Sequence, residues 1–256
     1  LNSFGNSAKL GKSNWCLIES DESDGSFLKI PFTYSIITNI DSEHLDFYKS
    51  LENLKKSFSS FIEKTPSLGK TFLCIDDKNI NQIIKKTNNK NFYTYGLSKD
   101  ANFHITNTLQ KEKYSEFNLK VKIPGNKKEI KKIKIPLIGM HNIKNAASCV
   151  AVAFLIGIND KIIKKGLINF KGVERRFNFL FKKNNVLFFD DYAHHPTEIS
   201  SVLDGVKEVY QDKEIVCVFQ PHRISRVKNL TYEFSKSFQK LSLIHILRAH
   251  ETPCHL

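Results

Sequence analysis

The fold is decided by one stretch of the chain, Val186-Leu187-Phe188-Phe189-Asp190-Asp191-Tyr192-Ala193-His194-His195-Pro196-Thr197-Glu198. Its first four residues form an apolar run that is too short for a helix and is bounded by polar residues, which indicates a buried strand. Pro196 suits the first turn of a helix, and four apolar residues follow it at helical spacing, Ile199, Val202, Leu203 and Val206. Two acids and two histidines therefore lie where a strand ends and a helix begins, the edge at which open α/β sheets bind ligands. An Asp-rich helix cap with solvated histidines is the structural alternative.

Strand-like and helical segments alternate before and after this stretch. We expect strands at 15–18, 34–40, 71–75, 92–95 and 215–219, and helices at 51–62, 79–86, 139–155 and 162–167. Between Phe103 and Ile135 apolar and polar residues alternate, which predicts a small antiparallel patch. Together these patterns predict an α/β fold with a mainly parallel sheet. A connector between about Phe170 and Arg176 indicates a domain boundary.

The composition is ordinary for a globular protein, with 41% hydrophobic and 25% charged residues in a chain of 256. No apolar run approaches the roughly 20 residues of a membrane span, and no signal segment opens the chain, so we expect a cytoplasmic protein. The five cysteines are far apart and show no zinc-binding spacing. The first four lie in apolar runs, so we expect them in the core of a protein from a reducing compartment.

The net charge of +13 raises the question of nucleic acid. Lysine is spread along the whole chain, and no basic motif with interleaved aromatic residues occurs. We interpret the charge as a mostly solvated face that also suits phosphate-bearing substrates. A basic nucleic-acid-binding protein remains the non-enzymatic alternative.

Acidic groups follow two of the expected strands. The first strand ends at Glu19-Ser20-Asp21-Glu22-Ser23-Asp24, and the second at Asp41-Ser42-Glu43-His44-Leu45-Asp46. Carboxylate oxygens are the ligands that Mg²⁺ prefers, so these loops are candidates for a cation site. A solvated acidic turn explains the first loop equally well. In a parallel sheet the two loops could converge on one point.

Polar and cationic groups occupy further strand ends and helix starts. His141, Asn142 and Asn145 lie at the beginning of the most apolar helix, where they either cap the helix or meet polar ligand groups. Arg175 and Arg176 lie in the connector, either solvated or available to grip phosphate. The last expected strand ends at Gln220-Pro221-His222-Arg223, with Arg226 close by.

Taken together, these stretches resemble the Mur ligase family. The ordered set that carries the resemblance is Glu19–Asp24, Thr38–Ile40 with His44, Gly139–Asn145, Arg175–Phe177, Asp190–Thr197 and Phe219–Arg223. The family has three domains, and its central domain carries a GxxxxGK[ST] phosphate loop that is not found in this sequence. The resemblance therefore implies a partial central ATPase-type domain at 1–172 and a partial Rossmann-like C-terminal domain at 173–242. The segment 243–256 does not look like the family, and we expect it to be an unrelated tail.

The resemblance also implies a reaction. In the family, ATP phosphorylates a carboxylate and an amine attacks the acyl phosphate, chemistry that depends on positioning and charge neutralisation. The two-histidine form of the Asp190 loop points to the member that joins L-alanine to UDP-N-acetylmuramate in peptidoglycan synthesis, or to its close relative, the murein-peptide ligase, which attaches a ready-made peptide. Because the phosphate loop is not in the sequence, we expect this chain alone not to turn over ATP.

By similarity, each candidate residue has an expected role. Glu22 and His44 would hold Mg²⁺ or Mn²⁺. The residues that would bind the nucleotide are His141, Asn142, Asn145, Arg176 and Asp191. Tyr192 and His222 would contact the amino-acid substrate. The catalytic residues would be His194, Arg223 and Arg226. The guanidinium groups of the two arginines suit the free carboxylate of an amino acid, because one guanidinium can hold both oxygens.

Overall fold

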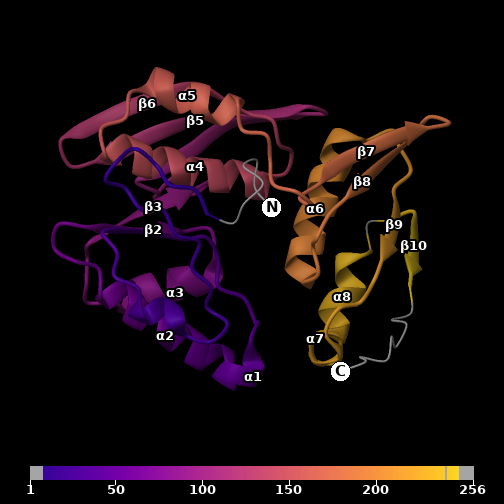
Figure 1. The fold of residues 1–256 in the computed structure, drawn as a ribbon, viewed down its shortest axis with the longest axis horizontal. Coiled ribbons are helices and arrows are strands. Elements are labelled where there is room, and N and C mark those ends of the chain that lie inside the picture. The colour runs from indigo at the N-terminus through magenta and orange to yellow at the C-terminus, as the bar shows by residue number, and fades with distance from the viewer. Residues whose placement is uncertain (1–7, 240, 248–256) are drawn as a thin grey trace.

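Two hydrophobic cores organise the chain in the computed structural model, which describes residues 8–239 and 241–247. The larger core draws on residues from Phe27 to Ile163, and the smaller one on residues from Ile199 to Phe234. We refer to the parts around them as the N-terminal body, which runs from η1 to α5, and the C-terminal body, which runs from β7 to β10. Figure 1 shows the two bodies side by side, with α6 of the C-terminal body facing α4 of the N-terminal body.

The N-terminal body contains, in chain order, η1 (Ser26–Lys29), β1 (Tyr34–Ile37), α1 (Leu45–Tyr48), α2 (Leu51–Glu63), β2 (Lys70–Cys74), α3 (Lys78–Lys86), β3 (Phe92–Gly96), β4 (Phe103–Lys111), β5 (Tyr114–Ile123), β6 (Asn126–Ile135), α4 (Met140–Leu155) and α5 (Asp160–Ile168). The C-terminal body contains β7 (Asn178–Lys183), β8 (Val186–Asp190), α6 (Pro196–Val209), β9 (Val216–Phe219), α7 (Ile224–Asn229), α8 (Thr231–Ser237) and β10 (Leu243–Ile246).

The N-terminal body is built on a six-stranded sheet with the strands in sequence order, β1 to β6. Strands β1 to β4 pair in parallel, and β4, β5 and β6 pair antiparallel. Helices α2 and α3 lie on one side of β2 and β3, and α4 lies on the other (Figure 1). Because both faces are covered, Thr71–Cys74 of β2 is buried throughout. The predicted α/β fold, its mainly parallel sheet and its antiparallel patch are confirmed.

The C-terminal body contains two separate two-stranded sheets. Strands β7 and β8 form an antiparallel pair, and β9 and β10 pair in parallel. Helices α6 and α8 pack together beside them. None of the helices in the described part of the chain is long and apolar enough to cross a membrane.

Three local predictions were wrong. The segment 15–18 is not a strand: Leu17 is 98% exposed, and no strand of the described chain pairs with the free edge of β1. The ring of Trp15 instead packs on Tyr34, with centroids 5.7 Å apart. Strand β8 forms as predicted but is only half-buried, because β7 is its one pairing partner among the described strands. Cys16 and Cys149 are exposed rather than in the core.

Candidate active site

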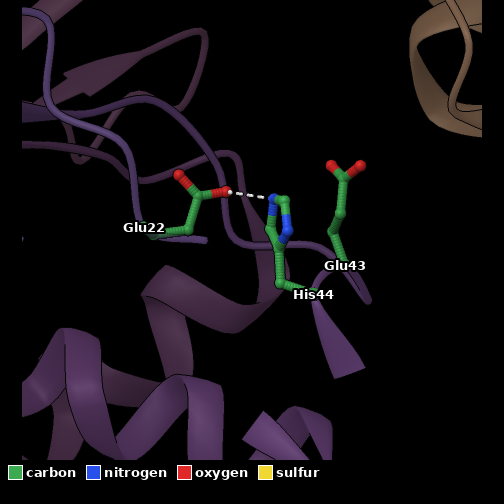
Figure 2. Close-up of side chains that lie close together, drawn as sticks. All are labelled: Glu22, Glu43 and His44. Atoms are coloured by element: carbon green, nitrogen blue, oxygen red, sulfur yellow. Dashed lines mark ion pairs between the residues drawn. The ribbon is translucent and has the colours of Figure 1, made fainter. Parts of the chain in front are cut away.

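Three side chains that can bind a cation converge in the N-terminal body. Glu22, Glu43 and His44 each offer a ligand atom, and these atoms lie within 4.8 Å of one another. The Nε2 atom of His44 lies 3.5 Å from Oε1 of Glu22, and Figure 2 shows Glu43 beside the same imidazole. Two carboxylates and an imidazole suit Mg²⁺ or Mn²⁺. The oxygen ligands favour Mg²⁺, and Mn²⁺ tolerates the nitrogen ligand better than Mg²⁺ does. The predicted pair of metal residues is therefore brought together, with Glu43 as a third member.

Local backbone structure holds this cluster in place. The carbonyl of Glu22 accepts hydrogen bonds from the amide of Gly25, at 3.0 Å, and from the Tyr48 hydroxyl. His44 is the N-cap of α1 and adopts a left-handed backbone, with φ of 55°. Such a conformation costs about 1–3 kcal/mol in a residue other than glycine and is concentrated at functional sites. Arg175 also has a positive φ, of 58°. Arg223 has φ of 60° and ψ of 108°, which is a positive-φ conformation outside the left-handed helical region.

A groove joins the cation cluster to the C-terminal body. It is lined by the loop 42–46 on one side and by the region of α7 on the other, where Arg223 and Arg226 lie. Arg226 is buried, with 9% of its surface exposed, and its Nη2 atom pairs with Oε1 of Glu43. Its Nη1 atom is buried and finds no hydrogen-bond partner within the described ranges. Arg223, the N-cap of α7, is exposed.

A second contact links the same loop to α6. The hydroxyl of Thr197 donates a hydrogen bond to Oδ2 of Asp41, and Nδ1 of His195 lies 3.8 Å from the same oxygen. His195 is the N-cap of α6, and Glu198 completes a capping box by accepting the amide of His195 at 3.2 Å. Thus Asp41 and Glu43, two residues apart, both contact the C-terminal body.

The residues predicted for the nucleotide form another group, at the start of α4. His141 is partly buried, and its Nδ1 atom is buried without a hydrogen-bond partner in the part of the chain that the structure describes. Burial lowers the pKa of His141; the negative charges of Asp191 and Glu198 oppose this shift, and the positive charge of Arg176 adds to it. His141, Arg176 and Asp191 are therefore neighbours, although they come from three segments of the chain.

Asp191 and Arg176 are held by the turns around β7 and β8. The Asp191 carboxylate accepts the amides of Phe177 and Ala193, each at 2.7 Å. The Nη1 atom of Arg176 lies 3.5 Å from Oε1 of Glu198. Burial raises the pKa of Glu198, but the amides of His194 and His195 and the charges of His194 and Arg176 outweigh it, so that the net shift is downward.

The two asparagines of α4 differ in their surroundings. The Nδ2 atom of Asn142 donates to the carbonyl of Ile138 at 2.7 Å, which is a local, structural hydrogen bond. Asn145 is exposed and lies four residues after His141, so the two residues share one face of α4.

The histidine loop after β8 forms a third group. Nδ1 of His194 lies 2.8 Å from the carbonyl oxygen of Tyr192. Since a carbonyl only accepts, Nδ1 carries a hydrogen, and Nε2 is the atom at which the ring can gain or lose a proton. The His222 ring lies 6.2 Å from that of His194, and the Arg175 guanidinium lies 4.9 Å from the centre of the Tyr192 ring.

The predicted residues are thus brought together in groups, and three others join them that the prediction left out. Glu43, Asp41 and Glu198 had a signal in the sequence, because each lies in a stretch already singled out for its acids. What the sequence did not reveal is which acid of each loop faces a partner. All three pair with residues of the C-terminal body or with its histidine loop.

Comparison with known proteins decides the family. The model of the Mur ligase middle domain matches residues 13–153, more than half of the 256 residues. The chain belongs to the Mur ligase family. A second model, described as Mur ligase, glutamate ligase domain, matches residues 175–253. This second match extends past Ser242, into the segment for which we expected no resemblance.

Named relatives of this Mur ligase chain fall in one group. This chain is 56% identical to the UDP-N-acetylmuramate–L-alanine ligase of Pelagibacter ubique (strain HTCC1062). The match covers 95% of this chain and 53% of the length of that relative. The protein of the same name from Bartonella bacilliformis is 36% identical over 96% of this chain and 52% of its own length. The Mur ligase chain thus spans about half the length of the curated relatives it matches.

Solved structures agree on the fold. The crystal structure of UDP-N-acetylmuramate-alanine ligase from Thermotoga maritima matches with a TM-score of 0.68 and 27% identity, over 89% of this Mur ligase chain and 48% of that protein. A murein peptide ligase from Psychrobacter arcticus matches with a TM-score of 0.56 over 87% of this chain and 51% of its own; at 18% identity this shows a shared fold alone.

Proposed function

We propose that this chain belongs to an ATP-dependent ligase that joins L-alanine to UDP-N-acetylmuramate in the cytoplasm, as a step of peptidoglycan synthesis. The single observation that carries the proposal is the 56% identity, over 95% of the chain, to the Pelagibacter ubique protein of that name. We further propose that the domain boundary lies between residues 172 and 173, which is supported by the separate hydrophobic cores on either side.

On the nucleotide side, the proposed contacts are His141, Asn142, Asn145, Arg176 and Asp191. The neighbourhood of His141, Arg176 and Asp191 supports this assignment. Because burial keeps the pKa of His141 low, its imidazole is neutral near pH 7 and can act as a hydrogen-bond donor or acceptor without adding charge. Arg176 supplies the positive charge that a polyphosphate needs. Asn142 serves this side indirectly, by holding the first turn of α4.

On the cation side, the proposed ligands are Glu22 and His44. The donor set of Glu22, Glu43 and His44, with ligand atoms within 4.8 Å of one another, fits a divalent cation. A bound Mg²⁺ or Mn²⁺ would neutralise the charge of the transferring phosphoryl group. The backbone of Glu22 is fixed by the turn at Gly25, and His44 is placed by its position as the N-cap of α1.

On the amino-acid side, Tyr192 and His222 are the proposed substrate contacts, and His194, Arg223 and Arg226 the proposed catalytic residues. Arg226 has a buried nitrogen without a partner in the described chain, which supports a role in holding the carboxylate of L-alanine. His194 donates through Nδ1 to the Tyr192 carbonyl, so its Nε2 atom can take a proton from the ammonium group of L-alanine, which leaves the amine as the nucleophile.

A chimaeric enzyme tests the proposed function. In it, this chain replaces the matched 245-residue segment of the Pelagibacter ubique ligase. We expect phosphate release from ATP that depends on UDP-N-acetylmuramate and on L-alanine, with the complete Pelagibacter enzyme as the positive control. Release that depends on a tripeptide instead of L-alanine would assign the chain to the murein-peptide ligases. A folded chimaera without either dependence would contradict the proposal.

A further inference from the structure

Glu43 lies between the cation cluster and the buried arginine. Its Oε1 atom pairs with Nη2 of Arg226, a residue 183 positions later in the chain. Its carboxylate also belongs to the group of ligand atoms formed with Glu22 and His44, and Figure 2 shows it beside the His44 ring. One carboxylate therefore contacts an arginine of the C-terminal body and borders a cation cluster of the N-terminal body.

The arginine is arranged to accept a second anion. Its side chain is only 7% exposed, so its charge is largely removed from water. A buried guanidinium is stable only when its nitrogens are paired, and the bond to Glu43 satisfies Nη2. Nη1 is buried and lacks a partner among the described residues, which points to an acceptor from a ligand. Because Glu43 pairs with Nη2, the planar guanidinium is held in one orientation, and the position of Nη1 is fixed with it.

The shared carboxylate also makes the two groups interdependent. A carboxylate that is hydrogen-bonded to a guanidinium donates less electron density to a cation, and a carboxylate that binds a cation holds a guanidinium less tightly. Any such coupling is reciprocal, because binding free energies at two linked sites must change each other equally.

We propose that Glu43 is a positioning residue: it fixes Arg226 so that Nη1 faces the substrate carboxylate, and it couples that arginine to the cation cluster. This inference rests on the proposed function only for the identity of the carboxylate as that of L-alanine. The link between Glu43, Arg226 and a divalent cation stands without it.

The coupling is tested by a double-mutant cycle on Mn²⁺ binding to the full 256-residue chain, measured by electron paramagnetic resonance of the free ion. The variants are Glu43→Gln, Arg226→Gln and both together. Arg226→Gln releases the Glu43 carboxylate toward the cluster, so we expect Mn²⁺ to bind about three- to tenfold more tightly, a typical range for coupled neighbours. In the Glu43→Gln background the same substitution is expected to change the affinity by less than about twofold.

The outcomes separate coupling from plain electrostatics. If removing the arginine tightens Mn²⁺ binding equally in both backgrounds, the effect is charge alone and the proposal is wrong. The proposal is also wrong if the chain binds no Mn²⁺, or if Arg226→Gln has no effect.

Asp41→Asn is the matched control, because it removes an acid of the same loop that contacts α6 but not Arg226. This substitution should leave the Glu43–Arg226 coupling intact. Circular dichroism of each variant verifies the fold, and Glu43→Ala, which also removes the carboxylate, replaces Glu43→Gln if the latter does not fold.

Equilibrium dialysis of labelled L-alanine against the same chain tests the orientation of Arg226. We expect Glu43→Gln to weaken binding about tenfold, with partial recovery in Glu43→Asp, because a charged partner bonds the guanidinium more strongly than an amide. Binding that is unchanged in Glu43→Gln overturns the positioning role. If the unsubstituted chain binds no L-alanine while the Mn²⁺ cycle shows coupling, the positioning of Arg226 toward L-alanine is wrong and the coupling of Glu43 to the cation cluster stands.

Discussion

Gly205 in α6 packs directly against the backbone of Gly139 at the start of α4: a Cβ atom on Gly205 would lie 2.8 Å from the Gly139 Cα. Gly139 has φ of 98°, a conformation that favours glycine. Its amide donates to Oε1 of Gln110 at 2.5 Å, and Nε2 of Gln110 donates to Glu208 of α6 at 2.5 Å. The two bodies therefore meet here backbone to backbone, within a small network of hydrogen bonds.

The first prediction concerns this contact. Gly205→Ala should lower the free energy of unfolding by about 1–3 kcal/mol, because the added methyl group has no room and one helix must shift. Urea unfolding followed by circular dichroism measures the change. Gly166→Ala in α5 is the matched control, since a Cβ there meets nothing within 4 Å. The control should be neutral or stabilising by up to about 1 kcal/mol, and a Gly205→Ala variant that behaves likewise would contradict the close packing.

The second prediction concerns the cation cluster. Glu22→Gln should weaken Mn²⁺ binding at least about tenfold, because it removes one of two carboxylates from a three-residue donor set. Electron paramagnetic resonance of free Mn²⁺ reports the affinity. Glu19→Gln changes an exposed acid of the same loop that is not in the cluster, and should change the affinity little. Equal losses in both variants would mean that Mn²⁺ responds only to the total charge.

The third prediction concerns pH. The net pKa of Glu198 is lowered in the folded chain despite its burial, through the amides of His194 and His195 and nearby positive charges. The stability that this ionised group contributes is therefore present above its unfolded pKa and is lost as the pH falls through its folded pKa. Glu198→Gln should flatten the dependence of the free energy of unfolding on pH below about 4.5. Urea unfolding at several acidic pH values tests this; an unchanged slope would exclude Glu198 as its source.

The fourth prediction concerns His194. In the chimaeric enzyme, His194→Gln should lower kcat by about 10²–10⁴, the usual contribution of a general base. Steady-state phosphate release measures the effect. His104→Gln is the control, since His104 lies in β4 in the N-terminal body, outside the candidate site; it should keep normal turnover. A loss that appears only in KM would show that His194 binds substrate without moving a proton.

Much of the fold follows from local patterns. The strands at β2 and β3 and the helices α2 and α4 were predicted because the spacing of apolar residues is a local property of the sequence. The segment 15–18 has the same apolar character but pairs with none of the strands that the structure describes, and pairing is a non-local property that its own residues do not encode.

The candidate site was predicted less completely, for a related reason. The acidic and histidine loops stood out because their residue types are unusual at strand ends. The pairs Glu43–Arg226 and Asp41–Thr197 join residues 183 and 156 positions apart. Which member of an acidic loop meets such a partner depends on side-chain direction, and this becomes definite only when both bodies are folded and in contact.

The left-handed backbone of His44 and Arg175 has a consequence for engineering. A laboratory selection for heat resistance alone would favour glycine or asparagine at these two positions, since both adopt that conformation at little cost. Each gain would erase an imidazole or a guanidinium from the candidate site. Stabilising substitutions that leave the candidate site side chains in place should instead be made at helical positions where an added Cβ meets no neighbour, such as Gly166.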